Sequence, residues 1–245
     1  MFFCGCNLGC VFCQNHVISA PDAESGAECD AHRLAEIYFS LMEQGAQNIN
    51  LVTAAIHTPA VIRSIRLAKK QGLRLPFVWN TNAYERTETL RALDGLIDIY
   101  LPDIKYVSPR VSLAYSDAAD YFEYAAPAVL EMQRQTGTLT LDENGAAKRG
   151  VLVRHLVLPC AVDQTRGVLD FVANNMPAST YVSLMRQYTP MYKALWHKTL
   201  GRRVTKREYE SAIDYALTLG LENVYIQSAK TATDAYTPDF DGTGL

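Results

Sequence analysis

The sequence lacks the features that mark membrane, secreted and nucleic-acid-binding proteins. It contains no run of about 18 apolar residues, the length that a membrane-spanning helix needs. Its first residues carry neither the basic flank nor the apolar stretch of a signal peptide, so we expect a cytoplasmic protein. The 23 basic and 26 acidic side chains give a net charge of -3, without an uninterrupted run of Lys and Arg. This composition predicts no association with a membrane and none with a phosphate backbone.

The chain also lacks linkers, low-complexity segments and internal repeats. An apolar fraction of 49% over 245 residues is enough to bury a sizeable core. We therefore expect one domain that spans residues 1–245, with a loosely ordered tail over residues 228–245.

Cysteine is scarce in most of the chain and concentrated at its start. Four of the six cysteines fall within the first thirteen residues, namely Cys4, Cys6, Cys10 and Cys13. A disulfide framework would spread its cysteines along the chain, whereas such a cluster is typical of metal binding or redox chemistry. Cys29 and Cys160 stand alone, and we interpret both as packing residues, because isolated thiols behave mostly as small apolar groups.

From residue 48 onward, short apolar runs alternate with amphipathic stretches, which is the pattern of repeated βα units. The predicted strands cover residues 1–3, 48–53, 75–80, 97–105, 150–158, 180–186 and 223–227. The predicted helices cover residues 31–44, 58–72 and 205–220, and the last begins at a capping box of Thr205 and Glu208. The pattern predicts an α/β fold, a partial (β/α)6 barrel of mainly parallel strands.

Two stretches break the alternation. Residues 106–137 are rich in Tyr and Ala, and we interpret them as an irregular helical insertion. Residues 142–145, with Asn-Gly at their tip, predict a turn that leads into the long strand after it.

The cysteine loop has the composition of a reactive metal site. Cys6, Cys10 and Cys13 form a CxxxCxxC spacing directly after an apolar strand. Three thiolates from one loop can hold three irons of a [4Fe-4S] cube, which leaves the fourth iron without a protein ligand. An open coordination position is what makes a metal centre reactive rather than structural.

The CxxxCxxC spacing, with Phe12 before the last cysteine, resembles the signature of the radical SAM superfamily. Further segments resemble the pyruvate formate-lyase activating enzyme and its uncharacterised homologues, namely residues 2–8, 50–53, 80–82, 101–105, 154–159 and 181–185. The resemblance implies one [4Fe-4S] cluster on Cys6, Cys10 and Cys13, with S-adenosylmethionine on its open iron. It implies an oxidoreductase that cleaves S-adenosylmethionine reductively to a 5'-deoxyadenosyl radical, which abstracts hydrogen. A reductant such as flavodoxin or ferredoxin would supply the electron.

The same resemblance implies where the methionine half of the cofactor binds. Residues 53–55 take the place of a Gly-Gly-Glu segment that receives the methionine amino group, which leaves the Thr53 hydroxyl and backbone carbonyls for that role. Asn80 and Thr81 match an Asp-Thr-Asn-Gly segment, and Asp103 matches a strand-end Asp; in the family these residues hold a monovalent cation beside the methionine carboxylate. Asn80 in place of Asp lowers the charge of the site.

Four further residues complete the implied cofactor site. Lys105 and Arg154 match basic residues near the cofactor, where an ammonium or guanidinium suits a carboxylate. Asn15 matches a contact to the ribose or the carboxylate, and Leu156 an apolar wall for the adenine. The strand residues among them lie at the C-terminal ends, where barrel active sites are built. No catalytic residue is assigned beyond the cluster.

Three hypotheses for function stay open at this stage. The first is an activating enzyme that abstracts hydrogen from a backbone glycine of a partner, a glycyl radical protein. The second is a radical SAM oxidoreductase that acts on a small molecule or another protein residue. The third is a zinc-stabilised binding module without turnover, because Cys10, Cys13 and His16 also form a CxxCxxH spacing that Cys6 would complete. Structural zinc normally supports a domain too small to fold alone, which disfavours the third hypothesis.

Several residues receive no settled role from the sequence. Cys4 and His57 carry no clear signal. Arg186 follows the sixth predicted strand with Gln187 and Tyr188, and these three stay open candidates for lining the substrate side. We interpret His155 as a packed histidine, because it alternates with Arg154 along its strand and therefore faces the opposite side.

Overall fold

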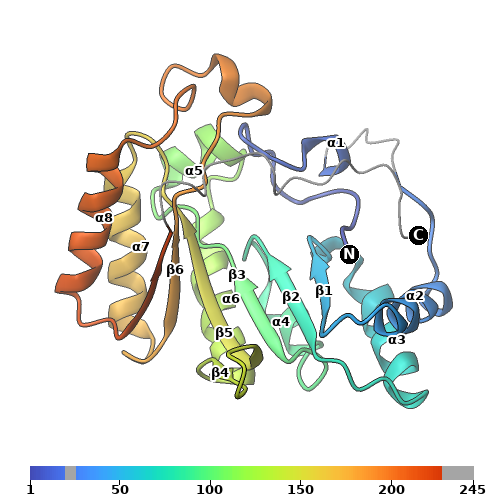
Figure 1. Cartoon of the computed structure of the whole chain (residues 1–245). Coiled ribbons are helices and arrows are strands. Elements are labelled where there is room, and N and C mark those ends of the chain that lie inside the picture. Colours follow the sequence, from blue (N-terminus) through green and yellow to red (C-terminus); the bar gives the residue numbers. More distant parts are fainter. Residues whose placement is uncertain (20–25, 228–245) are drawn as a thin grey trace.

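Six parallel strands in chain order form the centre of the computed structural model, which describes residues 1–19 and 26–227 (Figure 1). The expectation for the tail over 228–245 falls outside the described residues. The helices are α1 His16–Ser19, α2 Ala31–Glu43, η1 Ala55–His57, α3 Thr58–Lys70, α4 Thr87–Arg91, α5 Pro109–Ser116, α6 Tyr121–Thr136, α7 Val162–Asn175, η2 Tyr192–Trp196 and α8 Lys206–Thr218. The strands are β1 Ile49–Val52, β2 Phe77–Thr81, β3 Ile99–Pro102, β4 Thr140–Leu141, β5 Ala147–Leu156, β6 Tyr181–Met185 and β7 Asn223–Ile226.

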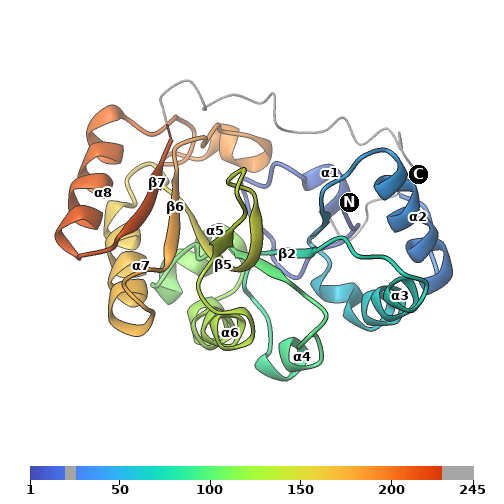
Figure 2. The same cartoon turned by 60° about the horizontal axis from the view of Figure 1, so that its bottom comes forward.

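The sheet has the order β1-β2-β3-β5-β6-β7, and every neighbouring pair on this path is parallel. The short strand β4 pairs with β5 in the antiparallel sense, through the turn predicted over residues 142–145. Figure 2 shows helices α3, α4, α6 and α7 along the outer side of the curved sheet. Strands that follow one another in space as in sequence, with helices on one side, form the predicted partial barrel.

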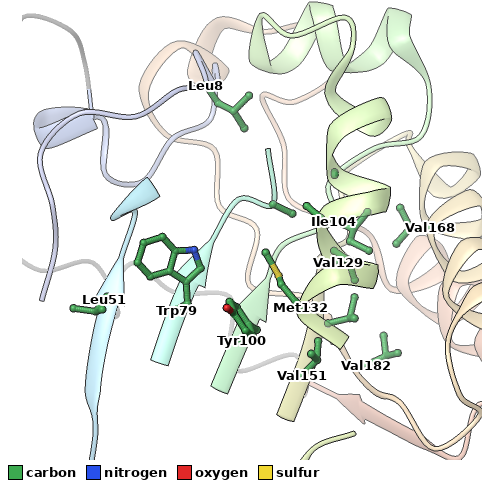
Figure 3. Close-up of a cluster of buried hydrophobic side chains, with 14 of the residues drawn as sticks. Leu8, Leu51, Trp79, Tyr100, Ile104, Val129, Met132, Val151, Val168 and Val182 are labelled. Atoms are coloured by element: carbon green, nitrogen blue, oxygen red, sulfur yellow. The ribbon is translucent and has the colours of Figure 1, made fainter. Parts of the chain in front are cut away.

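Alternation along the strands separates a helix-facing row from a row that faces the barrel interior. Leu51, Trp79, Tyr100 and Val151 are neighbours in register and almost fully buried. Figure 3 shows these side chains gathered with Val129 and Met132 of α6 in the core. Because successive side chains point to opposite faces, the residues next to this row face the interior of the barrel. The hydrophobic row thus fixes which strand residues line the site.

The helix boundaries follow their capping residues. The Asp30 carboxylate accepts a hydrogen bond from the Arg33 N–H at 2.8 Å and begins α2. Thr205 and Glu208 form the predicted capping box at the start of α8. Gly45 and Gly220 follow α2 and α8 at positive φ, the conformation in which helices commonly end. No helix among the described residues is long and apolar enough to cross a membrane.

The prediction that residues 106–137 are helical is confirmed, but they are not an irregular insertion. These residues form two regular helices, and α6 is the crossover that connects β3 to β5 across the outer face of the sheet. Its buried positions include Tyr121, Ala125, Val129 and Met132, which recur at helical spacing. Pro127 lies inside α6 on its exposed face, although a proline is expected to break a helix interior.

Two predicted strands are shorter than expected. The strand predicted over 97–105 is β3 Ile99–Pro102, and Asp103 adds a single bridge to Arg154. The strand predicted over residues 1–3 is reduced to one parallel bridge between Phe2 and Val52. Both shortened segments border the cavity described below, where side-chain contacts replace the backbone hydrogen bonds of the sheet.

We predict that Pro127→Ala raises the free energy of unfolding by about 1 kcal/mol, measured by urea denaturation. A proline inside a helix is about 3 kcal/mol less favourable than alanine, and the greater freedom of the unfolded alanine chain offsets part of this gain. Pro109→Ala is the matched control, because Pro109 is also exposed but occupies the first position of α5, where proline is favoured. A gain of equal size in the control would contradict the assignment.

Candidate active site

A cavity of about 360 Å³ lies at the C-terminal ends of the strands, beneath the loop that carries the cysteines. In Figure 1 this loop is the blue segment at the top of the molecule, between α1 and α5. All eleven residues assigned from the sequence line this cavity, namely Cys6, Cys10, Cys13, Asn15, Thr53, Asn80, Thr81, Asp103, Lys105, Arg154 and Leu156. The fold therefore brings together residues that are up to 150 positions apart in sequence. Their roles as ligands stay predictions.

A network of charged side chains forms the floor of the cavity. The Asp103 carboxylate accepts from Arg154 Nε at 2.8 Å and Nη2 at 2.7 Å. Its second oxygen lies 3.3 Å from Lys105 Nζ. Arg154 Nη2 also donates to Asn80 Oδ1 at 2.6 Å. Three strand ends, those of β2, β3 and β5, are thereby joined by side chains.

The network holds both of its titratable partners in their charged forms. Burial alone would raise the pKa of Asp103, but Arg154 and Lys105 outweigh it and hold that pKa below its ordinary value. Burial alone would lower the pKa of Lys105, and the Asp103 carboxylate outweighs it and raises that pKa. Two cations and one carboxylate leave an excess of one positive charge at this point of the cavity.

Tyr121 braces the chain beside the network. Its hydroxyl donates toward the carbonyl oxygens of Asp103 at 2.7 Å and Asn82 at 2.9 Å, and accepts from the Lys105 N–H at 3.1 Å. Tyr121 begins α6 and is fully buried. The helix that sequence analysis took for an insertion therefore positions the residues after β2 and β3.

The cysteine loop is hydrogen-bonded to the C-terminal end of α5. The N–H groups of Gly9 and Val11 donate to the carbonyls of Ser116 and Tyr115 at 3.0 and 2.9 Å. These carbonyls belong to the last turn of a helix, where acceptors have no partner within the helix. Leu8 and Phe12 are buried and anchor the loop in the core. The loop is thus fixed by both backbone and apolar contacts.

Each of the three sulfurs has at least one polar side-chain neighbour. Cys10 Sγ lies 3.0 Å from Ser116 Oγ, and Cys13 Sγ lies 3.2 Å from Ser19 Oγ. Asn82 Nδ2 donates to Cys6 Sγ at 3.4 Å. Hydroxyl and amide donors of this kind suit thiolates, whose hydrogen bonds tune the potential of an iron–sulfur cluster.

The arrangement of the donors fits a cluster better than a single metal ion. Among the residues that the structure describes, no three His, Cys, Asp or Glu side chains are grouped as ligands of one ion. A zinc tetrahedron would need its ligands at about 2.0–2.3 Å from one point. The three thiolates of a [4Fe-4S] cube bind three different irons, so they need not converge. His16, the fourth ligand in the zinc hypothesis, instead stacks on Tyr192 at 4.7 Å.

The turn after β1 has a strained backbone at the edge of the cavity. Thr53 has a φ of 61°, in the left-handed region that β-branched residues rarely adopt. Its N–H donates to the Asn80 carbonyl at 3.0 Å. Ala83, after β2, has a φ of 62°. The chain thus forms both turns without glycine, the residue that adopts this conformation most easily.

Sequence analysis missed further residues that line the cavity. They are Asn50, Asn82, Met185 and Thr189, together with Met1, Phe2, Leu8, Phe12, Gln14 and Val52. Gln187 and Tyr188, which the sequence left as open candidates for the substrate side, also line the cavity. Strand alternation would have found Asn50, which lies two residues before Val52 on the same face. Residues 187–189 lie in an irregular segment after β6, for which the sequence carries no periodic signal.

The other residues left without a settled role lie outside the cavity lining. His155 is buried, and its Nδ1 donates to the Ile104 carbonyl at 2.7 Å while its Nε2 accepts from the Thr165 hydroxyl at 2.9 Å. Arg186 lies over the Tyr209 ring at 5.3 Å. His57 Nε2 contacts the Cys4 carbonyl at 2.7 Å.

The interpretation of Cys160 as a packing residue is wrong. Its side chain is exposed after β5, and its Sγ lies 3.0 Å from Arg202 Nη2. Cys29 is partly buried against the core, as expected.

Comparisons with solved structures identify the fold as that of radical SAM enzymes. A domain of pyruvate-formate lyase-activating enzyme from Bacteroides vulgatus superposes with a TM-score of 0.51 at 14% identity, over 75% of this chain and all of that one. The protein anSMEcpe with bound AdoMet gives a TM-score of 0.58 at 10% identity, over 88% of this chain and 57% of that one. Streptococcus suis SuiB bound to its precursor peptide SuiA gives a TM-score of 0.60 at 11% identity, over 93% of this chain and 48% of that one. The predicted α/β partial barrel is confirmed.

At the level of sequence, the chain is similar to an uncharacterised protein of Methanocaldococcus jannaschii. The two are 30% identical over 230 residues, which cover 92% of this chain and 63% of that protein. The chain thus spans less than two thirds of the length of this relative. No protein-family model matches the chain.

We predict that Thr53→Gly raises the free energy of unfolding by about 1 kcal/mol, because glycine adopts the left-handed conformation without a steric penalty. Ala54→Gly is the control, since Ala54 has a φ of -80° and gains nothing from glycine. It should lower stability by about 0.5–1 kcal/mol. Thermal unfolding of both variants checks the prediction, and a loss of stability in Thr53→Gly would contradict it.

Proposed function

We propose that this protein is a radical SAM enzyme, in which Cys6, Cys10 and Cys13 hold a [4Fe-4S] cluster and the adjoining cavity binds S-adenosylmethionine. The observation that carries the proposal is the shared cavity: the three thiols and the Asp103–Arg154–Lys105 network line the same space. When bound, this pair of cofactors supplies a 5'-deoxyadenosyl radical by one-electron cleavage of the sulfonium. The radical SAM fold of the structural neighbours supports this reaction class.

The chain's own residues would orient the methionine half of the cofactor. The excess positive charge of Lys105 and Arg154 over Asp103 complements a carboxylate in a partly desolvated cavity. Thr53 would present its hydroxyl to the methionine ammonium. The side chains of Lys105 and Arg154 are only 16% and 21% exposed, so water weakens these interactions less than on an open surface.

Other cavity residues would bind the nucleoside half. Leu156 follows Arg154 by two positions on β5 and therefore faces the same interior side, where it would form an apolar wall for the adenine. Asn15 lies two residues after Cys13 and would contact the ribose or the carboxylate. Neither residue would take part in the chemistry itself.

We further propose that Arg154 replaces the monovalent cation that the resemblance implied. The oxygens that would hold such an ion, Asn80 Oδ1 and one oxygen of Asp103, already accept from the Arg154 guanidinium, and Lys105 contacts the other oxygen of Asp103. Asn80 in place of Asp removes one negative charge from the same point. The guanidinium thus supplies the positive charge that the site requires.

For the substrate, we propose a peptide or protein segment, with hydrogen abstraction from a backbone glycine as the specific case. Two structural neighbours support this class, because one is a domain of a pyruvate-formate lyase-activating enzyme and another was solved with a precursor peptide. A small-molecule substrate stays the alternative, and product analysis with a glycyl radical protein as substrate would separate the two.

The reaction class is tested by cofactor loading and turnover. Anaerobic reconstitution should load about four irons and four sulfides per chain. Addition of dithionite and S-adenosylmethionine should then give 5'-deoxyadenosine, whose amount is measured by chromatography. Cys6→Ala, Cys10→Ala and Cys13→Ala should abolish both. Cys160→Ala is the matched control, because it removes a thiol outside the cavity and should retain both. Stoichiometric zinc without iron would contradict the proposal.

The role of Arg154 is tested by the dependence of cofactor affinity on cations. Calorimetry should show that the affinity of the reconstituted protein for S-adenosylmethionine changes less than about twofold when choline replaces K⁺ at constant ionic strength. Arg154→Ala should weaken that affinity about tenfold or more, the equivalent of about 1.4 kcal/mol, and K⁺ or Na⁺ should restore part of it. Wild-type affinity that depends steeply on K⁺ would overturn this assignment.

A further inference from the structure

The three thiols border a second cavity on the side away from the strand ends. This cavity, of about 320 Å³, is lined by Cys6, Cys10 and Cys13 together with residues of the cysteine loop, α1 and η2. None of the charged residues at the strand ends lines it. The cysteine loop is therefore accessible from two sides, one through the barrel interior and one from outside.

The outer cavity has aromatic and basic walls. His16 stacks on Tyr192 at 4.7 Å, and Lys193 Nζ lies over the Tyr192 ring at 5.1 Å. Lys193 lines the cavity, and the acidic residue that faces it there is Asp117. The Ala194 N–H donates to the Val11 carbonyl at 2.8 Å, which ties η2 directly to the cysteine loop.

The surface beyond this cavity, residues 192–207, carries a local excess of positive charge. It contains six basic side chains, of which Arg202 pairs with Glu208 at 2.7 Å and Lys206 with Glu210 at 3.5 Å. The excess of four positive charges stands in a chain whose net charge is -3. Lys193 and Lys198 are exposed. Leu195 and Trp196 are 55% and 83% exposed in the same segment. In Figure 1 the segment is the orange coil at the top of the molecule, above the blue cysteine loop.

The 192–207 surface is rigid where it meets the rest of the chain. The Tyr188 hydroxyl donates to the Leu200 carbonyl at 2.7 Å, and His197 Nδ1 accepts from the N–H groups of Thr199 and Leu200, each at 3.2 Å. These hydrogen bonds hold the segment in place while the side chain of Trp196 stays exposed. Exposed aromatic side chains surrounded by charge are typical of protein interaction sites.

We propose that the 192–207 surface docks a small acidic protein that carries one electron at a time, and that the electron reaches the cysteine loop through the outer cavity. The proposal rests on the proposed function. The carrier loses one electron and the protein's cluster gains one, with no transfer of atoms. Charge complementarity selects an acidic carrier, because opposite potentials steer association and fix orientation.

The two-sided access argues against a substrate at this surface. A substrate of the proposed reaction must reach the inner cavity, where the cofactor site is assigned. An electron carrier needs only to approach the thiols, and the outer cavity leads to them without crossing the charged network. The carrier and the substrate would then occupy opposite sides of the cysteine loop.

The test compares two double charge reversals. Lys193→Glu with Lys198→Glu changes the 192–207 surface, and Lys70→Glu with Lys148→Glu is the matched control, with the same change of net charge at exposed positions in α3 and the start of β5. The probe is an acidic flavodoxin, and its affinity for the reconstituted protein is measured by calorimetry at low and high salt.

The reversal at 192–207 should weaken flavodoxin affinity about tenfold or more, and should remove most of its salt dependence. Reduced flavodoxin should drive 5'-deoxyadenosine formation about tenfold more slowly in this variant, while the rate with dithionite stays at the wild-type value. Trp196→Ala should also weaken flavodoxin binding. The control variant should match the wild type in every measurement.

Equal flavodoxin affinity in the wild type and the 192–207 variant, or equal losses in the variant and its control, would overturn the docking proposal. So would tight salt-dependent binding of a single-stranded oligonucleotide that displaces flavodoxin. If dithionite itself gives no 5'-deoxyadenosine with the wild type, the proposed function fails, and this result is separate from a loss confined to the flavodoxin-driven reaction.

Discussion

The pairing of Asp103 with Arg154 is the interaction on which the site depends. A carboxylate and a guanidinium in a partly buried cavity are costly to desolvate unless each finds its partner, and removal of one leaves the other uncompensated. Because Asp103 directly follows β3 and Arg154 lies two residues before the end of β5, their contact is possible only when the parallel strands keep their register. Asn80 extends the same contact to β2. The arrangement of the cavity is therefore coupled to the arrangement of the sheet.

The segment between β3 and β5 contributes as much to the site as the strands do. The last turn of α5 accepts hydrogen bonds from the cysteine loop, and Ser116 Oγ lies beside Cys10. The first residue of α6, Tyr121, holds the backbone after β2 and β3. A single crossover thus positions the thiols from one side and the charged network from the other.

Much of the fold could be predicted from local periodicity, and the assigned cavity residues from the resemblance of their segments to a known family. Polar residues at the ends of apolar runs must meet at one edge of a parallel sheet, which is why the assigned residues share a cavity. The regularity of the crossover helix α6 and the exposure of Cys160 were not predicted, because both depend on tertiary packing. The contact of Arg154 with Asn80 could not be predicted, because it depends on side-chain geometry across two strands.

The burial of His155 makes the fold sensitive to acid. This ring lies between the sheet and α7, and burial lowers its pKa from 6.5 to about 4, although the bond to the Ile104 carbonyl favours the charged form. Between pH 6.5 and about 4, His155 is protonated in the unfolded chain but stays neutral in the folded chain. Stability is full above this window and falls by about 1.4 kcal/mol for each pH unit within it. Acid thus lowers the stability of the fold through a residue on the face of the sheet opposite the cavity.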